Sequence, residues 1–324
     1  MTNRPWVSGG AAEPDPTARQ RTVITKDGLQ LGVAEYGPPD GTPIIGIHGT
    51  PGSRYGGPPP DKPDLYDRLG ARVIGFDRPG YGISDRRAGR VAADAAADVA
   101  AIADALELET FAVTGGSGGG PHCLAVATLL PEQVTRAACV VGVAPLGVPG
   151  LPEAEWIEGM TQGNVNEFMW AMQGEEVLRP QLETQAGEDL ARVAVDPANP
   201  LDDAYEMSDG DREIMARPEY AVRMQRLMQE AYRNGVDGWV DDDLAFVRSW
   251  GFDLSELTVP TMVWYGTDDT LVPPTHGNWL AENVPAAIVV TMDGGHLELV
   301  NRAEELLLWL LKGEVPTDAV QTRP

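Results

Sequence analysis

Short apolar runs alternate with helical patterns along the first part of the chain. The apolar runs occupy residues 43–47, 73–76 and 111–113, and the helical patterns between them occupy residues 64–69 and 91–106. Ahead of them, residues 22–25 and 29–36 flank the turn Lys26-Asp27-Gly28 and predict a β-hairpin. Because strands that alternate with helices form parallel sheets with a helix layer on each face, the predicted fold class is α/β with a mostly parallel central sheet.

The same alternation returns near the end of the chain after a long interruption. Apolar runs at 137–143, 259–265 and 286–292 predict three more strands, and residues 297–311 have a helical pattern. Between residues 146 and 245 the chain instead carries helix-like pieces rich in Glu, Met, Trp and Tyr. This pattern predicts a helical segment inserted between two core strands.

The composition argues against several classes of partner. The 324 residues include 49 acidic and 24 basic side chains, and the net charge of −25 opposes binding to nucleic acid or to an anionic membrane. No apolar stretch approaches the roughly 18 residues that span a bilayer. Cys123 and Cys139 lie in apolar segments without zinc-type spacing, so we expect buried thiols, no metal site and a cytoplasmic protein.

A glycine-rich motif marks a candidate nucleophile. Gly115-Gly116-Ser117-Gly118-Gly119 follows the apolar run that ends at Val113 and precedes a helical pattern from Pro121. A sharp turn from strand to helix holds its central residue in strained geometry, and flanking glycines give it space. The turn exposes Ser117 Oγ, while the start of the helix directs free N–H groups at a nearby oxyanion. We therefore expect Ser117 to be the nucleophile of an acyl-transfer reaction.

Two later loops supply the acid and the base that such a serine needs. The strand at 259–265 leads into Asp268 and Asp269, and the strand at 286–292 leads into His296. The order serine, acid, histidine, with the last two after later strands, is the one that accompanies a nucleophile on this kind of turn. His296 is the candidate general base, and both aspartates are candidates for the acid.

These motifs resemble the serine hydrolases of the α/β-hydrolase superfamily, in the branch with a helical cap that includes esterases, lactonases and proline iminopeptidases. Two further segments carry the resemblance. Residues 44–52 (IIGIHGTPG) are similar to the family's oxyanion loop after its third strand, and residues 73–84 (VIGFDRPGYGIS) to the segment after its fourth. The similarity covers residues 21–145 and 246–312.

The resemblance implies a core that a cap interrupts. The expected divisions are a flexible leader at 1–20, an α/β-hydrolase core at 21–145 and 246–314, a helical cap at 146–245 and a flexible tail at 315–324. The leader lacks the apolar h-region of a signal peptide, so we expect neither a secretion signal nor a membrane anchor in it.

The resemblance also assigns roles close to the nucleophile. The family's spacing G-x-x-D-x-x-V-P occurs at residues 266–273 and favours Asp269 over Asp268 as the triad acid. The family binds the oxyanion with the backbone N–H of the residue after the nucleophile and with one from the oxyanion loop. These positions correspond to Gly118 and Thr50.

Other residues are expected to have structural roles. In the resembling family the position of His48 is hydrogen-bonded within the oxyanion loop, and the segment of Asp77 and Arg78 braces that loop, so we expect a structural ion pair there. His122 is expected to be packed or to face the cap, and His276 to lie at the surface.

The expected cap is rich in aromatic and thioether side chains. Most of them should pack the cap onto itself, while some roof the cleft and bind an apolar acyl or ring group. The candidates for substrate binding are Trp156, Met160, Phe168 and Trp170.

The expected reaction is hydrolysis of a carboxylic ester or lactone of a small to medium apolar substrate, through an acyl-enzyme and without a metal or organic cofactor. A proline iminopeptidase-like exopeptidase is an alternative, although Gly118 stands where that subfamily usually has Trp. Its substrate ammonium would need cap carboxylates, for which the candidates are Glu153, Glu155, Glu158 and Glu167. The triad also suits carbon–carbon bond hydrolysis, acyl transfer or cyclisation, and the scaffold suits a non-catalytic ligand-binding protein. The oligomeric state stays open.

Overall fold

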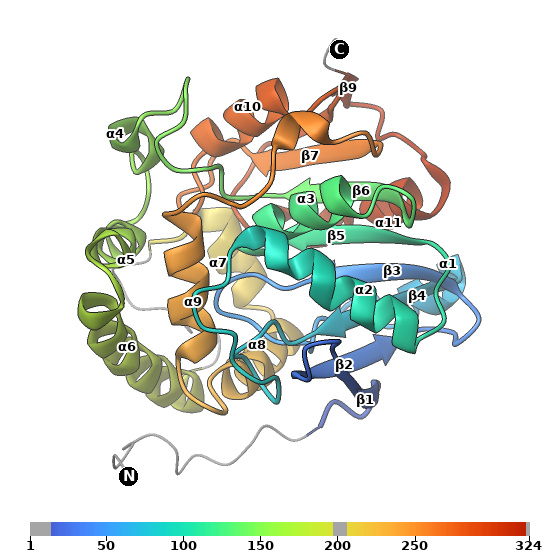
Figure 1. Cartoon of the computed structure of the whole chain (residues 1–324), viewed down its shortest axis with the longest axis horizontal. Helices are drawn as coiled ribbons and strands as arrows, with labels where there is room; N and C mark the ends of the chain where they lie inside the picture. The colour runs from blue at the N-terminus through green and yellow to red at the C-terminus, as the bar shows by residue number, and fades with distance from the viewer. Residues whose placement is uncertain (1–13, 197–205, 322–324) are drawn as a thin grey trace.

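The computed structural model describes residues 14–196 and 206–321, and one sheet runs through its middle (Figure 1). In these residues nine strands follow the order β1-β2-β4-β3-β5-β6-β7-β8-β9. They are β1 (Arg19–Ile24), β2 (Gln30–Tyr36), β3 (Thr42–Ile47), β4 (Ala71–Phe76), β5 (Phe111–Gly116), β6 (Val134–Val140), β7 (Thr261–Gly266), β8 (Ile288–Met292) and β9 (Val320–Gln321). Neighbours from β4 to β8 are parallel, whereas β1, β2 and β9 pair antiparallel. The predicted α/β class with a mostly parallel sheet is confirmed.

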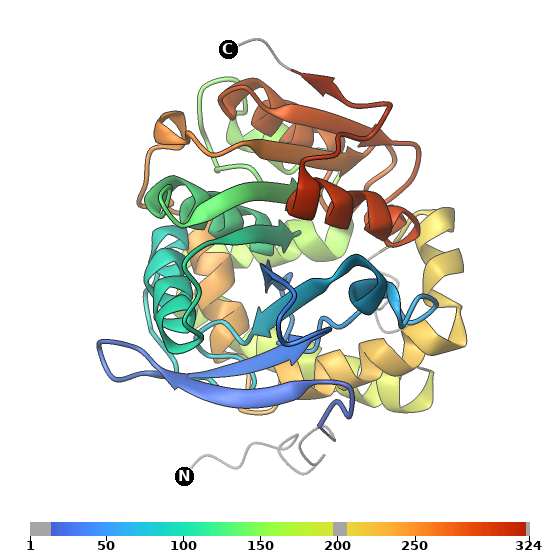
Figure 2. The same ribbon diagram turned by 90° about the vertical axis from the view of Figure 1, so that its right-hand side faces the viewer.

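Helices cover both faces of this sheet, because the parallel strands are apolar on both sides. One face packs against α2, α3 and α10, and the other packs against α1 and α11 (Figures 1 and 2). These helices are α1 (Leu65–Leu69), α2 (Ala95–Ala105), α3 (Gly119–Leu129), α10 (Pro274–Asn283) and α11 (Ala303–Lys312). No helix in the described part of the chain combines the length and the apolar character needed to cross a membrane.

A run of helices separates β6 from β7 and gathers beside one end of the sheet (Figure 1). We call them the inserted helices: α4 (Glu153–Trp156), α5 (Gln162–Gln173), α6 (Glu175–Val195), α7 (Asp209–Met215), α8 (Pro218–Ala231) and α9 (Asp237–Phe246). They occupy the segment 146–245 that we expect to be a cap, except that α9 runs one residue beyond it to Phe246. Residues 197–205 of this segment lie outside the described residues. The exact division between core and cap stays a prediction.

Both ends of the described chain are tied to the sheet further out than expected. β1 begins at Arg19, inside the predicted flexible leader, and buried Asp15 accepts a hydrogen bond from Tyr36 Oη at 3.3 Å. β9 lies inside the predicted flexible tail and pairs with β8. This pairing gives hydrogen-bond partners to backbone groups of β8 that would otherwise lie at an open edge of the sheet. These contacts correct the leader and the tail over the residues involved. The remainder, 1–13 and 322–324, lies outside the described residues.

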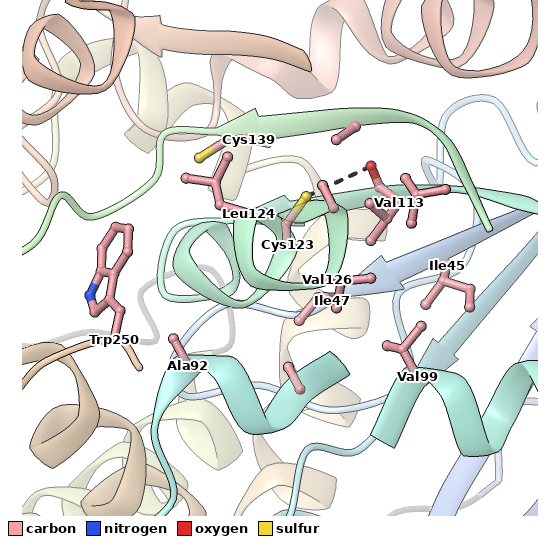
Figure 3. Packing of buried hydrophobic residues seen from close by; sticks show 14 of the residues in the cluster. Ile45, Ile47, Ala92, Val99, Val113, Cys123, Leu124, Val126, Cys139 and Trp250 are labelled. Atoms are coloured by element: carbon pink, nitrogen blue, oxygen red, sulfur yellow. Dashed lines mark hydrogen bonds between the residues drawn. The ribbon is translucent and has the colours of Figure 1, made fainter. Parts of the chain in front are cut away.

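Helix α3 packs on the centre of the sheet through apolar side chains. Leu124 and Val126 of α3 belong to the same buried cluster as Ile45 and Val113 of the sheet (Figure 3). Cys123 Sγ lies 3.8 Å from Val113 O in this cluster, and both cysteines of the chain are buried free thiols, as expected. The start of α3 is therefore anchored beside the ends of the central strands.

Two glycines let α3 start directly against the sheet. A Cβ atom on Gly115 would lie 2.2 Å from Gly119 O, and one on Gly119 would lie 2.4 Å from Ile47 O. A Cβ atom on Gly116 would meet its nearest neighbour, Val140 O, at 3.9 Å, which is an ordinary contact. The close approach of β5, α3 and β3 therefore depends on Gly115 and Gly119 and not on every glycine of the motif.

We predict that Gly115→Ala lowers the free energy of unfolding by about 1–3 kcal/mol, because the added methyl group forces the turn away from α3. Gly116→Ala is the matched control and should leave that free energy unchanged or slightly higher, since alanine restricts the unfolded chain. Urea denaturation of the two variants checks the prediction. Equal losses in both would contradict it.

Candidate active site

Ser117 lies in the turn between β5 and α3. Its φ of 55° is in the left-handed region that residues other than glycine rarely adopt. Ser117 N donates to Val140 O at 2.9 Å, and Gly120 N donates to Ser117 O at 2.8 Å, so the turn is fixed on both sides. The sharp turn from strand to helix places the serine between the end of a central strand and the N-terminus of a helix.

The loops after β7 and β8 bring Asp269 to His296. Asp269 Oδ2 lies 2.7 Å from His296 Nδ1. The other carboxylate oxygen, Oδ1, accepts hydrogen bonds from the N–H groups of Leu271 and Val272, each at 2.9 Å. Asp268, in contrast, is exposed to solvent. Of the two adjacent aspartates, the one that the family spacing favours is therefore the one that contacts the histidine.

A carboxylate from the inserted helices holds the histidine loop. Asp211, on α7, accepts hydrogen bonds from His296 N at 2.9 Å and Leu297 N at 2.7 Å. Burial alone would lower the pKa of His296, but the charge and hydrogen bond of Asp269 and the charge of Asp211 outweigh it, so the pKa is raised above 6.5. Sequence reasoning missed Asp211, because the only local signal beside it is Ser208, the N-cap of α7.

A cavity of about 540 Å³ opens beside these residues. Ser117, His296, Thr50 and Gly118 all line it, so the structure brings the predicted nucleophile, base and oxyanion residues to one space. Its volume is typical of a site for a small molecule. Most other lining side chains are apolar and include Phe168, Met215, Met224, Leu227, Trp239 and Phe246.

Only one of the four cap side chains expected to bind substrate, Phe168, lines this cavity in the described residues. Trp156 is fully buried instead; its Nε1 donates to Ala144 O at 2.8 Å, and its ring packs edge-on against Phe168. Met160 packs against the core, and Trp170 against the other inserted helices. Among the described residues these three side chains pack against the protein and do not line the cavity, and their role in substrate binding stays a prediction.

Thr50 and Gly118 lie against one another at the edge of the cavity. A Cβ atom on Gly118 would fall 2.2 Å from Thr50 Oγ1. Arg78 holds the loop that carries Thr50, because its guanidinium donates to His48 O, to Gly49 O at 3.1 Å and to Thr50 Oγ1 at 3.0 Å. The two backbone segments expected to bind an oxyanion are thus adjacent and braced.

The predicted ion pairing of Asp77 and Arg78 forms with partners elsewhere in the chain. Asp77 pairs with Arg54 and also accepts a hydrogen bond from Arg54 N at 2.7 Å. Arg78 pairs with Asp242 of α9. All four side chains are buried, so both residues have the expected bracing contacts although they do not pair with each other.

Two further histidines differ in how well the sequence predicted them. His48 Nδ1 lies 2.7 Å from Gly49 O within the oxyanion loop, as expected. The prediction that His276 lies at the surface is wrong: it is buried, Nδ1 accepts from Ala144 N at 3.0 Å, and Nε2 lies 2.8 Å from Trp156 O. Burial lowers its pKa to about 4, so it is a neutral structural residue. Among the described residues, no group of three or more His, Cys, Asp or Glu is arranged to hold a metal ion.

Known proteins share the sequence pattern and the fold of this chain. The sequence model of the α/β-hydrolase fold family matches residues 42–302. A non-heme chloroperoxidase of Streptomyces lividans is 28% identical over 267 residues, which are 78% of this chain and 83% of that protein. An esterase of Thermogutta terrifontis has a TM-score of 0.62 at 22% identity, covering 90% of this chain and 96% of its own. The enol-lactonase of Burkholderia xenovorans LB400 has a TM-score of 0.62 at 18% identity, with 89% and 96% covered. The two structures are similar to this chain in fold.

We predict that an NMR titration of the imidazole resonances gives His296 a pKa above 6.5. Asp269→Asn should lower this pKa, because it removes the charge and the charge-assisted hydrogen bond that oppose the effect of burial. Asp268→Asn changes the adjacent, exposed carboxylate and should leave the pKa nearly unchanged. A larger shift in Asp268→Asn than in Asp269→Asn would reverse the assignment of the acid.

Proposed function

The chain belongs to the α/β-hydrolase fold family, and from this premise we propose that it is a serine hydrolase that cleaves a carboxylic ester or lactone of a small to medium apolar substrate. One observation carries the proposal. His296, with Asp269 Oδ2 2.7 Å from its Nδ1, lines the same cavity as Ser117. A serine, a histidine and a buried carboxylate so arranged form a nucleophile, its base and the partner of the base.

In the first half of the proposed reaction, Ser117 Oγ attacks the carbonyl carbon while His296 Nε2 takes the hydroxyl proton. The hydrogen bond from Nδ1–H to Asp269 leaves Nε2 as the basic nitrogen and stabilises the imidazolium that forms. The N–H groups of Thr50 and Gly118 bind the negative oxygen of the tetrahedral intermediate. His296 then protonates the departing alkoxide, which leaves as an alcohol, and the acyl group stays on Ser117.

In the second half, His296 removes a proton from water as the water oxygen attacks the acyl-enzyme. The second tetrahedral intermediate collapses, Ser117 Oγ regains its proton from His296, and the carboxylic acid is released. With a lactone, the alcohol and the acid are two ends of one product. Because only neutral His296 is a base, kcat/KM should fall as the pH drops through its raised pKa.

The lining of the cavity supports an apolar substrate. Phe168, Trp239 and Phe246 line the same cavity as Ser117, and so do Met215 of α7 and Met224 and Leu227 of α8. Each methylene group buried on such a surface contributes about 0.8 kcal/mol to binding. Esters with longer acyl chains should therefore bind more tightly until the cavity is filled.

The state of the two cysteines supports the proposal that this reaction takes place in a reducing compartment. Cys123 and Cys139 are buried free thiols, as is usual for proteins of the cytoplasm. We therefore place the proposed hydrolase in the cytoplasm, with a small molecule as its partner.

A second candidate function, removal of an N-terminal residue as by a proline iminopeptidase, has one observation in its favour. Glu167 lines the cavity and accepts a hydrogen bond from Trp239 Nε1 at 2.8 Å, so one of the four carboxylates considered for a substrate ammonium belongs to the lining of this cavity. The other three proposed carboxylates, Glu153, Glu155 and Glu158, are exposed. Turnover of prolyl p-nitroanilide faster than of p-nitrophenyl butyrate would favour this function over ester hydrolysis.

We predict that Ser117→Ala lowers kcat/KM for p-nitrophenyl butyrate by about 10⁴-fold or more, because the oxygen that forms the acyl-enzyme is gone. Intact mass spectrometry after treatment with a fluorophosphonate should give one adduct on the wild type and none on Ser117→Ala. Steady-state kinetics and the two mass spectra check the prediction together.

Ser249→Ala, at an exposed serine, is the control and should keep both the turnover and the adduct. If the chain were a binding protein without catalytic activity, the wild type, Ser117→Ala and Ser249→Ala would all lack the adduct, and none of them would turn over the ester. Unchanged turnover in Ser117→Ala would remove the basis for a serine hydrolase.

A further inference from the structure

A buried group of polar side chains reaches the oxyanion loop from the inserted helices. Its centre is Asp242 on α9, whose side chain has no exposed surface. Asp242 Oδ2 accepts hydrogen bonds from Thr50 Oγ1 at 2.6 Å, from Tyr81 Oη at 2.7 Å and from Arg78. Arg90 Nη2 lies 2.6 Å from Asp242 Oδ1. One carboxylate on α9 is therefore hydrogen-bonded to the side chain of Thr50 and to two buried guanidinium groups.

A second branch of this group reaches Gly118 through His122. Arg90 Nη1 lies 3.3 Å from His122 Nε2, and His122 Nδ1 lies 2.8 Å from Gly118 O. A guanidinium only donates, so Nε2 is the acceptor and Nδ1 carries the proton that it donates to Gly118 O. Burial and the charge of Arg78 lower the pKa of His122 to about 3, which keeps this neutral tautomer in place. We call Asp242, Arg78, Arg90, Tyr81 and His122 the Asp242 network.

The Asp242 network has an excess of positive charge. Burial would raise the pKa of Asp242, but the two guanidinium groups outweigh it and hold that pKa well below the usual range. Burial and nearby Glu167 raise the pKa of Asp243, the next residue of α9, well above the usual range. Within the Asp242 network two guanidinium groups face one carboxylate, and their field favours negative charge at the oxyanion loop that Arg78 contacts.

We infer that Asp242 is a positioning residue of the oxyanion site, which holds Thr50 directly and Gly118 through Arg90 and His122. The inference rests on the proposed function, because the positions of these N–H groups matter for catalysis only if an oxyanion forms. Thr50 and Asp242 are 192 residues apart in the sequence, and α9 is one of the inserted helices. The inserted helices thus set the geometry of the oxyanion donors in addition to lining the cavity.

A pair of substitutions at Thr50 tests this role without removing the main-chain donor. Thr50→Val keeps the size of the side chain but loses the hydroxyl that contacts Asp242 and Arg78, whereas Thr50→Ser keeps that hydroxyl. The measurements are kcat and KM for p-nitrophenyl butyrate and the Ki of an alkyl trifluoromethyl ketone, whose adduct with Ser117 carries an oxyanion. Thr50→Val should lower kcat and the affinity for the ketone by a similar factor of about 10 to 100, with little change in KM. Thr50→Ser should recover most of both.

Neighbouring aspartates of α9 provide a second matched pair. Asp242→Asn should lower kcat and the affinity for the ketone by a common factor, as Thr50→Val should. Asp241→Asn breaks a different ion pair, the one in which Arg86 Nε lies 2.8 Å from Asp241 Oδ2. It should lower thermal stability without changing the ratio of the ketone Ki to the substrate KM, which separates positioning from general destabilisation.

The possible results are distinct. A Thr50→Val protein that folds normally and retains kcat and ketone affinity overturns the inference and leaves the proposed function intact. An equal loss in Thr50→Ser also overturns it, because the hydroxyl would then be irrelevant. If Asp242→Asn fails to fold, the Thr50 pair decides. A wild type that neither hydrolyses the ester nor forms the ketone adduct overturns the proposed function and the inference with it.

Discussion

The turn at Ser117 is the constraint on which the rest of the candidate site depends. A residue other than glycine with a φ of 55° costs roughly 1–3 kcal/mol, so its surroundings must hold it in place. Backbone hydrogen bonds on both sides of the turn do so, together with an approach of Gly115 to Gly119 that leaves no room for a Cβ atom. All other groups must then reach this fixed serine, His296 from the loop after β8 and Thr50 from the loop after β3.

Both of these loops are held by carboxylates of the inserted helices. Asp211 accepts two N–H groups of the His296 loop, and Asp242 accepts the hydroxyl of Thr50. Burying an ion pair such as that of Arg78 and Asp242 adds little net stability, because the loss of hydration offsets the attraction between the two ions. Removing one partner is costly, however, so the buried pair of Arg78 and Asp242 favours one arrangement of the loop over the others. Core and inserted helices therefore define the candidate site together.

Short-range patterns predicted most of the sheet and the loops that carry the candidate triad, because each of these features depends on neighbours in the sequence. The ends of strands were less predictable, because apolar periodicity does not encode local backbone geometry. The strand expected at 137–143, for example, ends at Val140, since Val141 has a φ of 43°. The contacts of Asp211 and Asp242 escaped prediction for another reason. They join segments that are 85 and 192 residues apart, and a single sequence carries no motif for such pairs.

The net charge of −25 has a different meaning at the surface and at the site. At physiological salt, charges in solvent are screened over about 8 Å, so most surface carboxylates have little effect at Ser117. Arg78 and Arg90 are buried within hydrogen-bond reach of Asp242, where the effective dielectric constant is lower and their field is stronger. On the proposed function, an oxyanion would form beside a loop that one of these buried guanidinium groups contacts, inside an acidic protein. The carboxylate product, once outside the cavity, would meet a surface of like charge that opposes its return.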